Sequence, residues 1–230
     1  MKIIGFIGAY DKTDLLLNIA KVLITMNNRV LLVDSTINQK AKYVVPAINP
    51  TVSYITSFED IDVAVGFNDI NEIQKYSGTM NEVPYDILLV DCDSIERIQI
   101  FQLEKASKNY FITSFDLYSL KKGLEILSNI DNQMNLTKVL FTKEMLKEDD
   151  EYLNYLSLGY KINWSDERIY FPIENGDLTV IAENQRLQKI RFRKLSVQYK
   201  DSIAFMVQQI LEEKSDSNIR KAIKNIEKGA

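Results

Sequence analysis

The sequence predicts an α/β fold in three layers, α/β/α, with a mostly parallel sheet between two layers of helices. Short, unbroken apolar runs recur along the chain, as expected of strands that are buried on both faces. Stretches with apolar residues at helical spacing lie between these runs. Strands that alternate with helices form parallel sheets through right-handed crossovers. At 230 residues the chain is long enough for one large domain of this kind.

The predicted strands and helices of the first half follow one another regularly. The strands are KIIGFI at 2–7, RVLLVD at 29–34, DILLVD at 86–91, NYFITS at 109–114 and KVLF at 138–141. Helical spacing of leucine, isoleucine and alanine predicts helices over 14–26 and 119–130. Residues 43–85 are less regular, and there we expect an edge hairpin from TVSYIT and DVAVGF, followed by a short helix at DINEIQKYS.

Fewer helices and strands are predicted for the second half of the sequence. The acidic stretch 144–156 predicts a surface helix or loop, and residues from 183 to about 213 predict one long final helix. A separate amphipathic helix is expected in the tail. Glycine and proline are scarce, with 8 and 4 residues, and no linker is evident. We therefore expect one domain over 1–213 and a short helix or tail over 214–230.

The composition excludes several kinds of site. The net charge of −4 provides no overall attraction for nucleic acid or an anionic membrane. The absence of histidine removes Ser-His and Cys-His nucleophiles and every metal site that contains histidine. The single cysteine, Cys92, excludes an intramolecular disulfide and fits a reducing compartment. With no signal-peptide pattern and no apolar run near the ~20 residues that span a bilayer, we expect a cytoplasmic protein.

A phosphate-binding loop is the strongest candidate site. The stretch GFIGAYDKTD at 5–14 joins the first predicted strand to the first helix, where α/β nucleotide-binding domains bind phosphates. Such loops follow Gly-x-x-x-x-Gly-Lys-Ser/Thr, so that backbone N–H groups, a helix N-terminus and the lysine converge on the phosphates. Lys12 and Thr13 keep the last two positions, but Asp11 replaces the glycine, and its charge disfavours phosphate. A strand-to-helix turn capped by threonine is the alternative, and the sequence leaves both open.

Two later strands end in acidic residues, VLLVDST with Asp34 and YDILLVDCD with Asp91. Together with the loop, this arrangement resembles the ParA/MinD family of deviant-Walker P-loop ATPases, which includes the TadZ and CpaE localisation proteins. The family motif Lys-Gly-Gly-x-Gly-Lys-Thr-Thr falls on residues 7–14. The resemblance implies a P-loop NTPase-like fold and nucleotide contacts from Gly8, Ala9, Tyr10, Asp11, Lys12, Thr13 and Asp14. The resemblance also implies that Mg²⁺, where it binds with the nucleotide, is held by Thr13, Asp34 and Asp91.

The chain departs from the family pattern at several positions. The signature lysine of the family falls on Ile7, and the second aspartate of its Asp-x-Asp motif, which orients the attacking water, falls on Thr36. The usual Thr-Pro-Pro is replaced by Cys92, Asp93 and Ser94. Asp34 and Asp93 are the remaining candidate catalytic residues. We expect slow or absent hydrolysis, while binding of ATP or ADP with Mg²⁺ stays open.

The resemblance covers most of residues 1–213 and includes a last strand at YFP, an adenine-side loop and a final helix. It implies a non-catalytic or weakly catalytic localisation or assembly factor for a secretion, pilus, conjugation or partition apparatus. Such a factor acts through protein partners, or as a dimer through the face that carries the loop. The alternative is an active ATPase that cycles on DNA or membrane, with Lys2, Lys40 or Lys42 replacing the lost lysine.

Two basic segments are candidate contact surfaces. One carries five cations and no acid, and these are Arg186, Lys189, Arg191, Arg193 and Lys194. It predicts either non-specific DNA contact or a solvated face at the start of the last helix. The other is the tail over 215–230, a basic amphipathic helix. It predicts peripheral contact with the inner face of a membrane, packing on a partner, or a frayed end.

Overall fold

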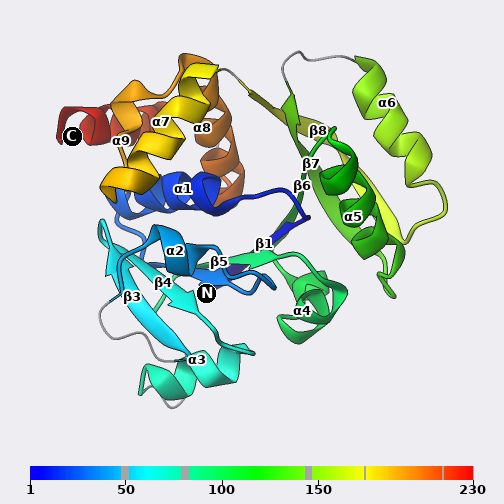
Figure 1. Cartoon of the computed structure of the whole chain (residues 1–230), viewed down its shortest axis with the longest axis horizontal. Coiled ribbons are helices and arrows are strands. Elements are labelled where there is room, and N and C mark those ends of the chain that lie inside the picture. The colour runs from blue at the N-terminus through cyan, green and yellow to red at the C-terminus, as the bar shows by residue number, and fades with distance from the viewer. Residues whose placement is uncertain (48–51, 79–82, 143–146, 174, 214, 230) are drawn as a thin grey trace.

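The computed structural model describes residues 1–47, 52–78, 83–142, 147–173, 175–213 and 215–229, and it confirms the predicted α/β fold (Figure 1). The strands of this part of the chain are β1 (Lys2–Ile7), β2 (Val30–Asp34), β3 (Tyr54–Phe58), β4 (Ile61–Val65), β5 (Ile87–Cys92), β6 (Lys108–Ser114), β7 (Met134–Thr142) and β8 (Ile162–Pro172). They form one sheet in the order β3-β4-β2-β5-β1-β6-β7-β8. Neighbouring strands are parallel except for the hairpin β3–β4 at one edge.

Helices cover both faces of the sheet (Figure 1). One face carries α1 (Thr13–Thr25), α2 (Ala41–Val44), α7 (Asn175–Leu187), α8 (Val197–Leu211) and α9 (Ser217–Gly229). The other carries α3 (Ile70–Tyr76), α4 (Ile95–Ile100), α5 (Leu117–Ser128) and α6 (Lys147–Leu156). Two short 3₁₀ helices, η1 (Leu103–Lys105) and η2 (Phe192–Lys194), lie in connections.

The central strands are buried on both faces, which explains their continuous apolar runs. In β1, Phe6 packs into the core on the α1 side, whereas Ile7 packs into the core on the α5 side. Leu89 and Leu88 of β5 divide in the same way. Side chains of a strand alternate between faces, so a strand with both faces covered is apolar along most of its length, and its few buried polar residues, such as Asp34 and Asp91, lie near the carboxyl end.

The position of β1 brings the candidate site together. This strand lies between β5 and β6, so the chain that leaves its carboxyl end turns over the sheet beside the carboxyl ends of its neighbours. Gly8 makes this turn with a φ of +140°, and a Cβ added there would lie 2.1 Å from the carbonyl oxygen of Ile112 in β6. Only glycine combines this backbone conformation with such a close approach.

The expected hairpin and the short helix within 43–85 are present as β3, β4 and α3. In the acidic stretch, residues 147–156 form α6, and 144–146 lie outside the described residues. The last strand begins at Ile162, well before the expected YFP, because β8 is an edge strand with many exposed positions and no continuous apolar run.

The single long helix predicted over 183–213 is wrong. The chain forms α7 and α8, which are separated by a turn and by η2. Gln188, with a φ of +50°, ends α7 in the left-handed conformation that usually calls for glycine. Asp177 then fixes the start of α8, because its carboxylate accepts hydrogen bonds from the backbone N–H and the hydroxyl of Ser196. Neither signal is visible in the hydrophobic periodicity.

The tail helix α9 packs against the protein itself. Its apolar residues Ile219, Ala222, Ile223 and Ile226 are all buried in the core beside α1, α8 and η2. The apolar face that predicted membrane contact is therefore covered in this structure. Among the helices that the structure describes, none has the length and apolar character needed to cross a membrane.

We expect Gly8→Ala to lower the free energy of unfolding by at least about 2 kcal/mol, because the added methyl group meets a backbone oxygen that cannot move freely. Urea unfolding of the purified variant measures this loss. Gly176→Ala is the matched control, since Gly176 is an exposed residue of α7 with no atom near its missing Cβ. Alanine there should be neutral or stabilise by up to about 1 kcal/mol. Equal stability of the two variants would contradict the packing described for Gly8.

Candidate functional site

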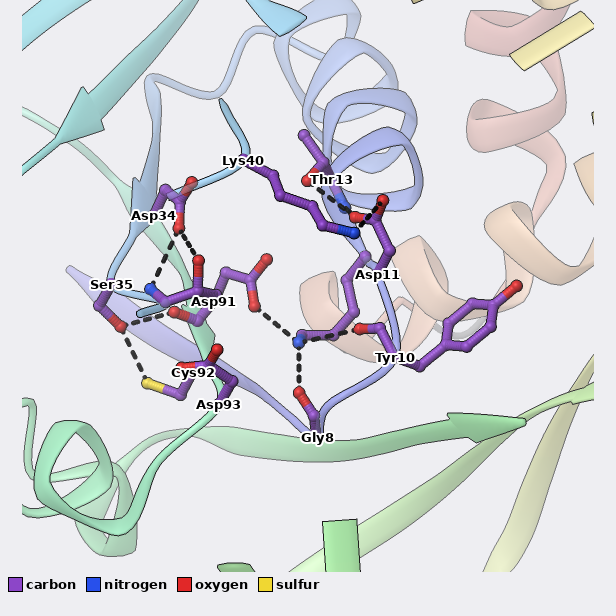
Figure 2. Close-up of polar contacts among 12 residues, drawn as sticks. Gly8, Tyr10, Asp11, Thr13, Asp34, Ser35, Lys40, Asp91, Cys92 and Asp93 are labelled. Atoms are coloured by element: carbon purple, nitrogen blue, oxygen red, sulfur yellow. Dashed lines mark hydrogen bonds and ion pairs between the residues drawn. The ribbon is translucent and has the colours of Figure 1, made fainter. Parts of the chain in front are cut away.

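The candidate site lies where the loop after β1 meets the carboxyl ends of β2 and β5 (Figure 2). The loop runs from Gly8 to Lys12, and α1 begins at Thr13. The structure thus brings the predicted phosphate loop together with Asp34 and Asp91, the acidic residues that end β2 and approach the end of β5. Residues far apart in the chain meet because parallel strands end at the same edge of the sheet.

Lys12 is folded into the protein. Its side chain is only 2% exposed, and its Nζ forms an ion pair of 2.7 Å with Oδ1 of Asp91. The same Nζ donates hydrogen bonds to the carbonyl oxygens of Gly8 at 2.7 Å and Tyr10 at 3.3 Å. An ammonium has three N–H donors, and two of them are used in these hydrogen bonds, while its charge faces the carboxylate of Asp91.

Asp91 is fully enclosed beside this lysine. Burial raises the pKa of Asp91 to about 7, although Lys12 favours its ionised form, and the nearby carboxylate of Asp34 adds to the rise. Ser35 fixes the backbone here, because its hydroxyl donates to the carbonyl oxygen of Asp91 at 2.5 Å and its Oγ lies 3.1 Å from Sγ of Cys92. Asp91 thus faces a cation that the protein itself supplies.

Asp11 covers the N-terminus of α1. Its Oδ1 accepts hydrogen bonds from the backbone N–H of Thr13 at 3.2 Å and from the hydroxyl of Thr13 at 3.0 Å. Its Oδ2 lies 3.0 Å from Nζ of Lys40 (Figure 2). Although burial opposes ionisation, the hydrogen bonds from Lys40 and Thr13 lower the pKa of Asp11. A carboxylate therefore accepts from the first backbone N–H of α1, one of the donors that a helix N-terminus offers to an anion.

The space left in the loop is small. The cavity measures about 40 Å³, which holds only a few water molecules. Its wall is formed by residues 8–13 together with Thr36, Asn38, Lys40, Asp91 and Asp93. A nucleotide polyphosphate with Mg²⁺ does not fit this arrangement, because Lys12 and the Thr13 hydroxyl are engaged elsewhere and Asp11 stands in front of them.

The two candidate catalytic carboxylates hold the chain that follows β2. Oδ1 of Asp34 accepts from the N–H and the hydroxyl of Thr36 at 3.1 and 2.6 Å, and its Oδ2 accepts from the N–H of Ala41 at 2.8 Å. Oδ1 of Asp93 accepts from the N–H of Ile37 at 3.0 Å. Catalytic roles for them stay predictions. Within the parts of the chain that the structure describes, no three carboxylates or thiols gather closely enough to hold a metal ion by themselves.

Sequence reasoning missed the partners of several loop residues. Of the three lysines considered as replacements, only Lys40 reaches the loop, and it does so through Asp11. Lys2 instead pairs with Glu212, at 2.8 Å. Asp14 accepts a hydrogen bond of 2.5 Å from Nε2 of Gln185 in α7. No sequence signal could identify these pairs, because each joins segments far apart in the chain.

A second hollow of about 130 Å³ lies beside the loop, at the predicted adenine side. The ring of Tyr10 stacks on Phe141 with centroids 4.5 Å apart, and Phe141 stacks on Phe171 at 5.0 Å. Both Tyr10 and Phe141 line the hollow together with Pro172 and Ile173. Small-molecule sites usually enclose about 300–1,000 Å³, so this hollow is small for a nucleoside.

The predicted basic segment does not lie at the start of the last helix. Arg186 belongs to α7, Lys189 and Arg191 to the turn that follows, and Arg193 and Lys194 to η2. Two of these cations share one carboxylate of α7, because Glu183 pairs with Arg191 at 3.1 Å and with Lys194 at 2.7 Å.

Comparison with known proteins identifies the fold. No protein-family model matches the chain, and no curated protein matches it in sequence. A chain of the MinC:MinD cell division protein complex from Aquifex aeolicus matches with a TM-score of 0.62 and 15% identity, over 94% of this chain and 97% of that one. MinD of Pyrococcus horikoshii, solved with Mg-ADP, matches with a TM-score of 0.56 and 15% identity, over 92% of this chain and 95% of that one. A ParA family ATPase from Chlorobium tepidum matches with a TM-score of 0.53 and 14% identity, over 97% of this chain and 96% of that one.

Identities this low establish the fold alone. The chain therefore has the fold of the MinD and ParA ATPases, as its motifs predicted.

The stability of the folded protein should depend on pH through Asp14, which lies in the first turn of α1. Burial raises the pKa of Asp14 from 3.8 to about 6, so the folded state binds its proton more tightly than the unfolded state does. The folded state is then progressively penalised as pH rises from about 4 to about 6. We expect Asp14→Asn to match the wild type near pH 4 and to be more stable by about 1–2 kcal/mol at pH 8, after allowance for partial exposure.

Urea unfolding at a series of pH values tests this expectation. Asp60→Asn serves as the control, because the side chain of Asp60 is 85% exposed and lies away from the loop. A pH-independent difference between Asp14→Asn and the wild type would show that the folded state does not retain the proton.

Proposed function

We propose that this protein is a non-catalytic or weakly catalytic localisation or assembly factor that acts through protein partners. The observation that carries the proposal is the carboxylate of Asp11, which occupies the N–H and the hydroxyl of Thr13. The N–H is one of the backbone donors that a phosphate loop offers to a phosphate, and the hydroxyl belongs to the residue whose oxygen would bind the metal ion. The protein thus supplies its own anion at the start of α1.

The two ion pairs of the loop differ in how strongly they oppose a nucleotide. The side chains of Lys40 and Asp11 are 51% and 41% exposed, and such pairs contribute at most about 1 kcal/mol. Lys12 and Asp91 are almost fully buried, and separating a buried pair leaves uncompensated charge at a cost of about 3–5 kcal/mol. A nucleotide would have to open both pairs and then bind next to the charge of Asp11.

Hydrolysis is further disfavoured by two missing groups. Ile7 and Thr36 stand where ParA- and MinD-like ATPases carry the signature lysine and the water-orienting aspartate. Phosphoryl transfer depends on positioning and charge stabilisation, so both losses act on the catalytic step itself. Binding and hydrolysis are thus opposed by different residues.

Exposed apolar side chains around the loop favour a docking role. Ile37 and Tyr43 follow β2, and Leu117 and Tyr118 open α5 after β6, all at the edge of the sheet that carries the loop. Ile37 and Leu117 are each 71% exposed. We propose this edge as the contact face for a partner protein or for a second copy. The Aquifex aeolicus neighbour is itself described as a MinC:MinD complex, which supports a protein partner.

The second candidate is an ATPase that cycles with ATP in plasmid or chromosome partition, or in positioning on DNA or membrane. It is favoured by the convergence of Lys12, Thr13 and Asp91 at one point of the fold. The partition protein of Borrelia burgdorferi, solved with AMPPNP, is a structural neighbour with a TM-score of 0.51. Peripheral membrane contact would use the outward lysines of α9, because its apolar face is packed.

A thermal-stability titration with Mg-ATP and Mg-ADP separates the two candidates. The wild type should show no shift up to millimolar nucleotide, whereas Asp11→Gly, which restores the motif glycine, should be stabilised. A ligand at 100 times its Kd adds about 2.7 kcal/mol, or roughly 5–10 °C in Tm for a chain of this size. Asp11→Gly combined with Lys12→Met is the control, and any shift that persists in it arises outside the loop.

Phosphate release is measured on the same samples. Stabilisation of the wild type that requires Lys12, together with phosphate release, would establish the ATPase and exclude the non-catalytic role. If nucleotide stabilises Asp11→Gly but not the wild type, and no phosphate is released, the result would support a phosphate site that Asp11 blocks and that has lost hydrolysis.

A further inference from the structure

A large cavity in the described part of the chain lies away from the phosphate loop. It measures about 650 Å³ and is enclosed by the second half of α1, the turn after α7, η2 and α9. Figure 1 shows α1, α7 and α9 side by side on this face of the sheet. The cavity is separate from the loop, because Lys21 lies more than two turns along α1 from Thr13, or about 12 Å.

Basic side chains dominate the wall of this cavity. Its cations are Lys21, Lys189, Arg191, Arg193 and Lys194. One carboxylate, Glu59, lines it with them. Four of these cations come from the stretch 189–194, and Lys21 of α1 adds a fifth from a separate segment.

Three of the five cations are neutralised within the protein. Nζ of Lys21 lies 3.3 Å from Glu59 and 3.5 Å from Asp60. Arg191 and Lys194 share Glu183. Lys189 and Arg193 have no ion-pair partner among the residues that the structure describes, and both are exposed at the cavity. The wall therefore offers two unpaired positive charges.

The carboxyl end of α1 does not cancel these charges. A helix C-terminus disfavours an anion through its free carbonyl groups. Here the carbonyl oxygens of Val22, Leu23 and Ile24 accept hydrogen bonds from the backbone N–H groups of residues 26–28, and the amide of Asn28 also donates to Leu23. These hydrogen bonds satisfy the carbonyls close to Thr25, which lines the cavity.

We propose that this cavity binds a small, soluble phosphate monoester with an apolar body up to the size of a nucleoside. A phosphate monoester carries a charge of about −1.5 to −2 at pH 7, which matches Lys189 and Arg193. Ile190 and Ile226 provide buried apolar contact beside the cations. The volume falls within the ~300–1,000 Å³ typical of small-molecule sites. The proposal does not depend on the phosphate loop or on its partners.

Isothermal titration calorimetry in EDTA at low salt tests the proposal with adenosine 5′-monophosphate and with inorganic phosphate. The wild type should bind the monophosphate more tightly than inorganic phosphate. Lys189→Ala combined with Arg193→Ala should weaken the monophosphate at least tenfold. Lys221→Ala combined with Lys224→Ala is the matched control, because it removes the same charge from exposed positions of α9 outside the cavity.

Each outcome decides the question. A loss confined to the Lys189 and Arg193 variant supports the cavity as a phosphate monoester site. An equal loss in the α9 control, or no binding by the wild type, overturns it. Duplex DNA or phosphatidic acid vesicles are titrated in parallel. Binding of either through Lys189 and Arg193, without binding of the soluble monophosphate, would also overturn the small-ligand assignment.

Discussion

The buried ion pair between Lys12 and Asp91 determines the shape of the loop that follows the central strand. Lys12 turns back over the loop and holds the carbonyl oxygens of Gly8 and Tyr10, so its position sets the backbone over the whole turn. The carboxylate comes from the neighbouring strand and is enclosed by the protein. Because neither charge has water to replace its partner, the pair ties the start of α1 to the centre of the sheet.

The arrangement around this pair explains how a phosphate-binding fold can exist without phosphate. A helix N-terminus requires an acceptor, and Asp11 provides one from within the loop. A loop lysine requires an anion, and Asp91 provides it. Tyr10 covers the adjoining aromatic surface by stacking on Phe141. The groups that would otherwise face a ligand are thus satisfied by neighbouring side chains, and the fold is complete by itself.

The fold could be predicted from the sequence because its strands and helices carry local signals. The unbroken apolar runs of β1, β2 and β5 report burial on both faces, and the loop at Gly8 follows directly from one of them. The break between α7 and α8 could not be predicted, since a glutamine adopts the left-handed conformation there. The edge strand β8 was placed too late because half-exposed strands lack a continuous apolar run.

The residues predicted for the phosphate loop lie close together in the structure, but their partners were not predicted. Lys12, Thr13 and Asp91 do meet, yet Asp91 faces a lysine, and Thr13 binds Asp11. Such pairings depend on geometry in three dimensions, and a motif fixes only which residues occupy the loop. Asp11 in place of glycine and Ile7 in place of the signature lysine were the local signs that the loop departs from the family motif.

The burial of α9 against α1 has a consequence for how the chain is made. The apolar face of α1 is completed by Ile219, Ile223 and Ile226, which a ribosome adds about 200 residues after α1 itself. At roughly 5–20 residues per second, translation separates the two helices by about 10–40 s. During this interval the nascent chain carries an incomplete core on one side of its sheet, and the part of α1 that α9 covers stays exposed until the last helix docks.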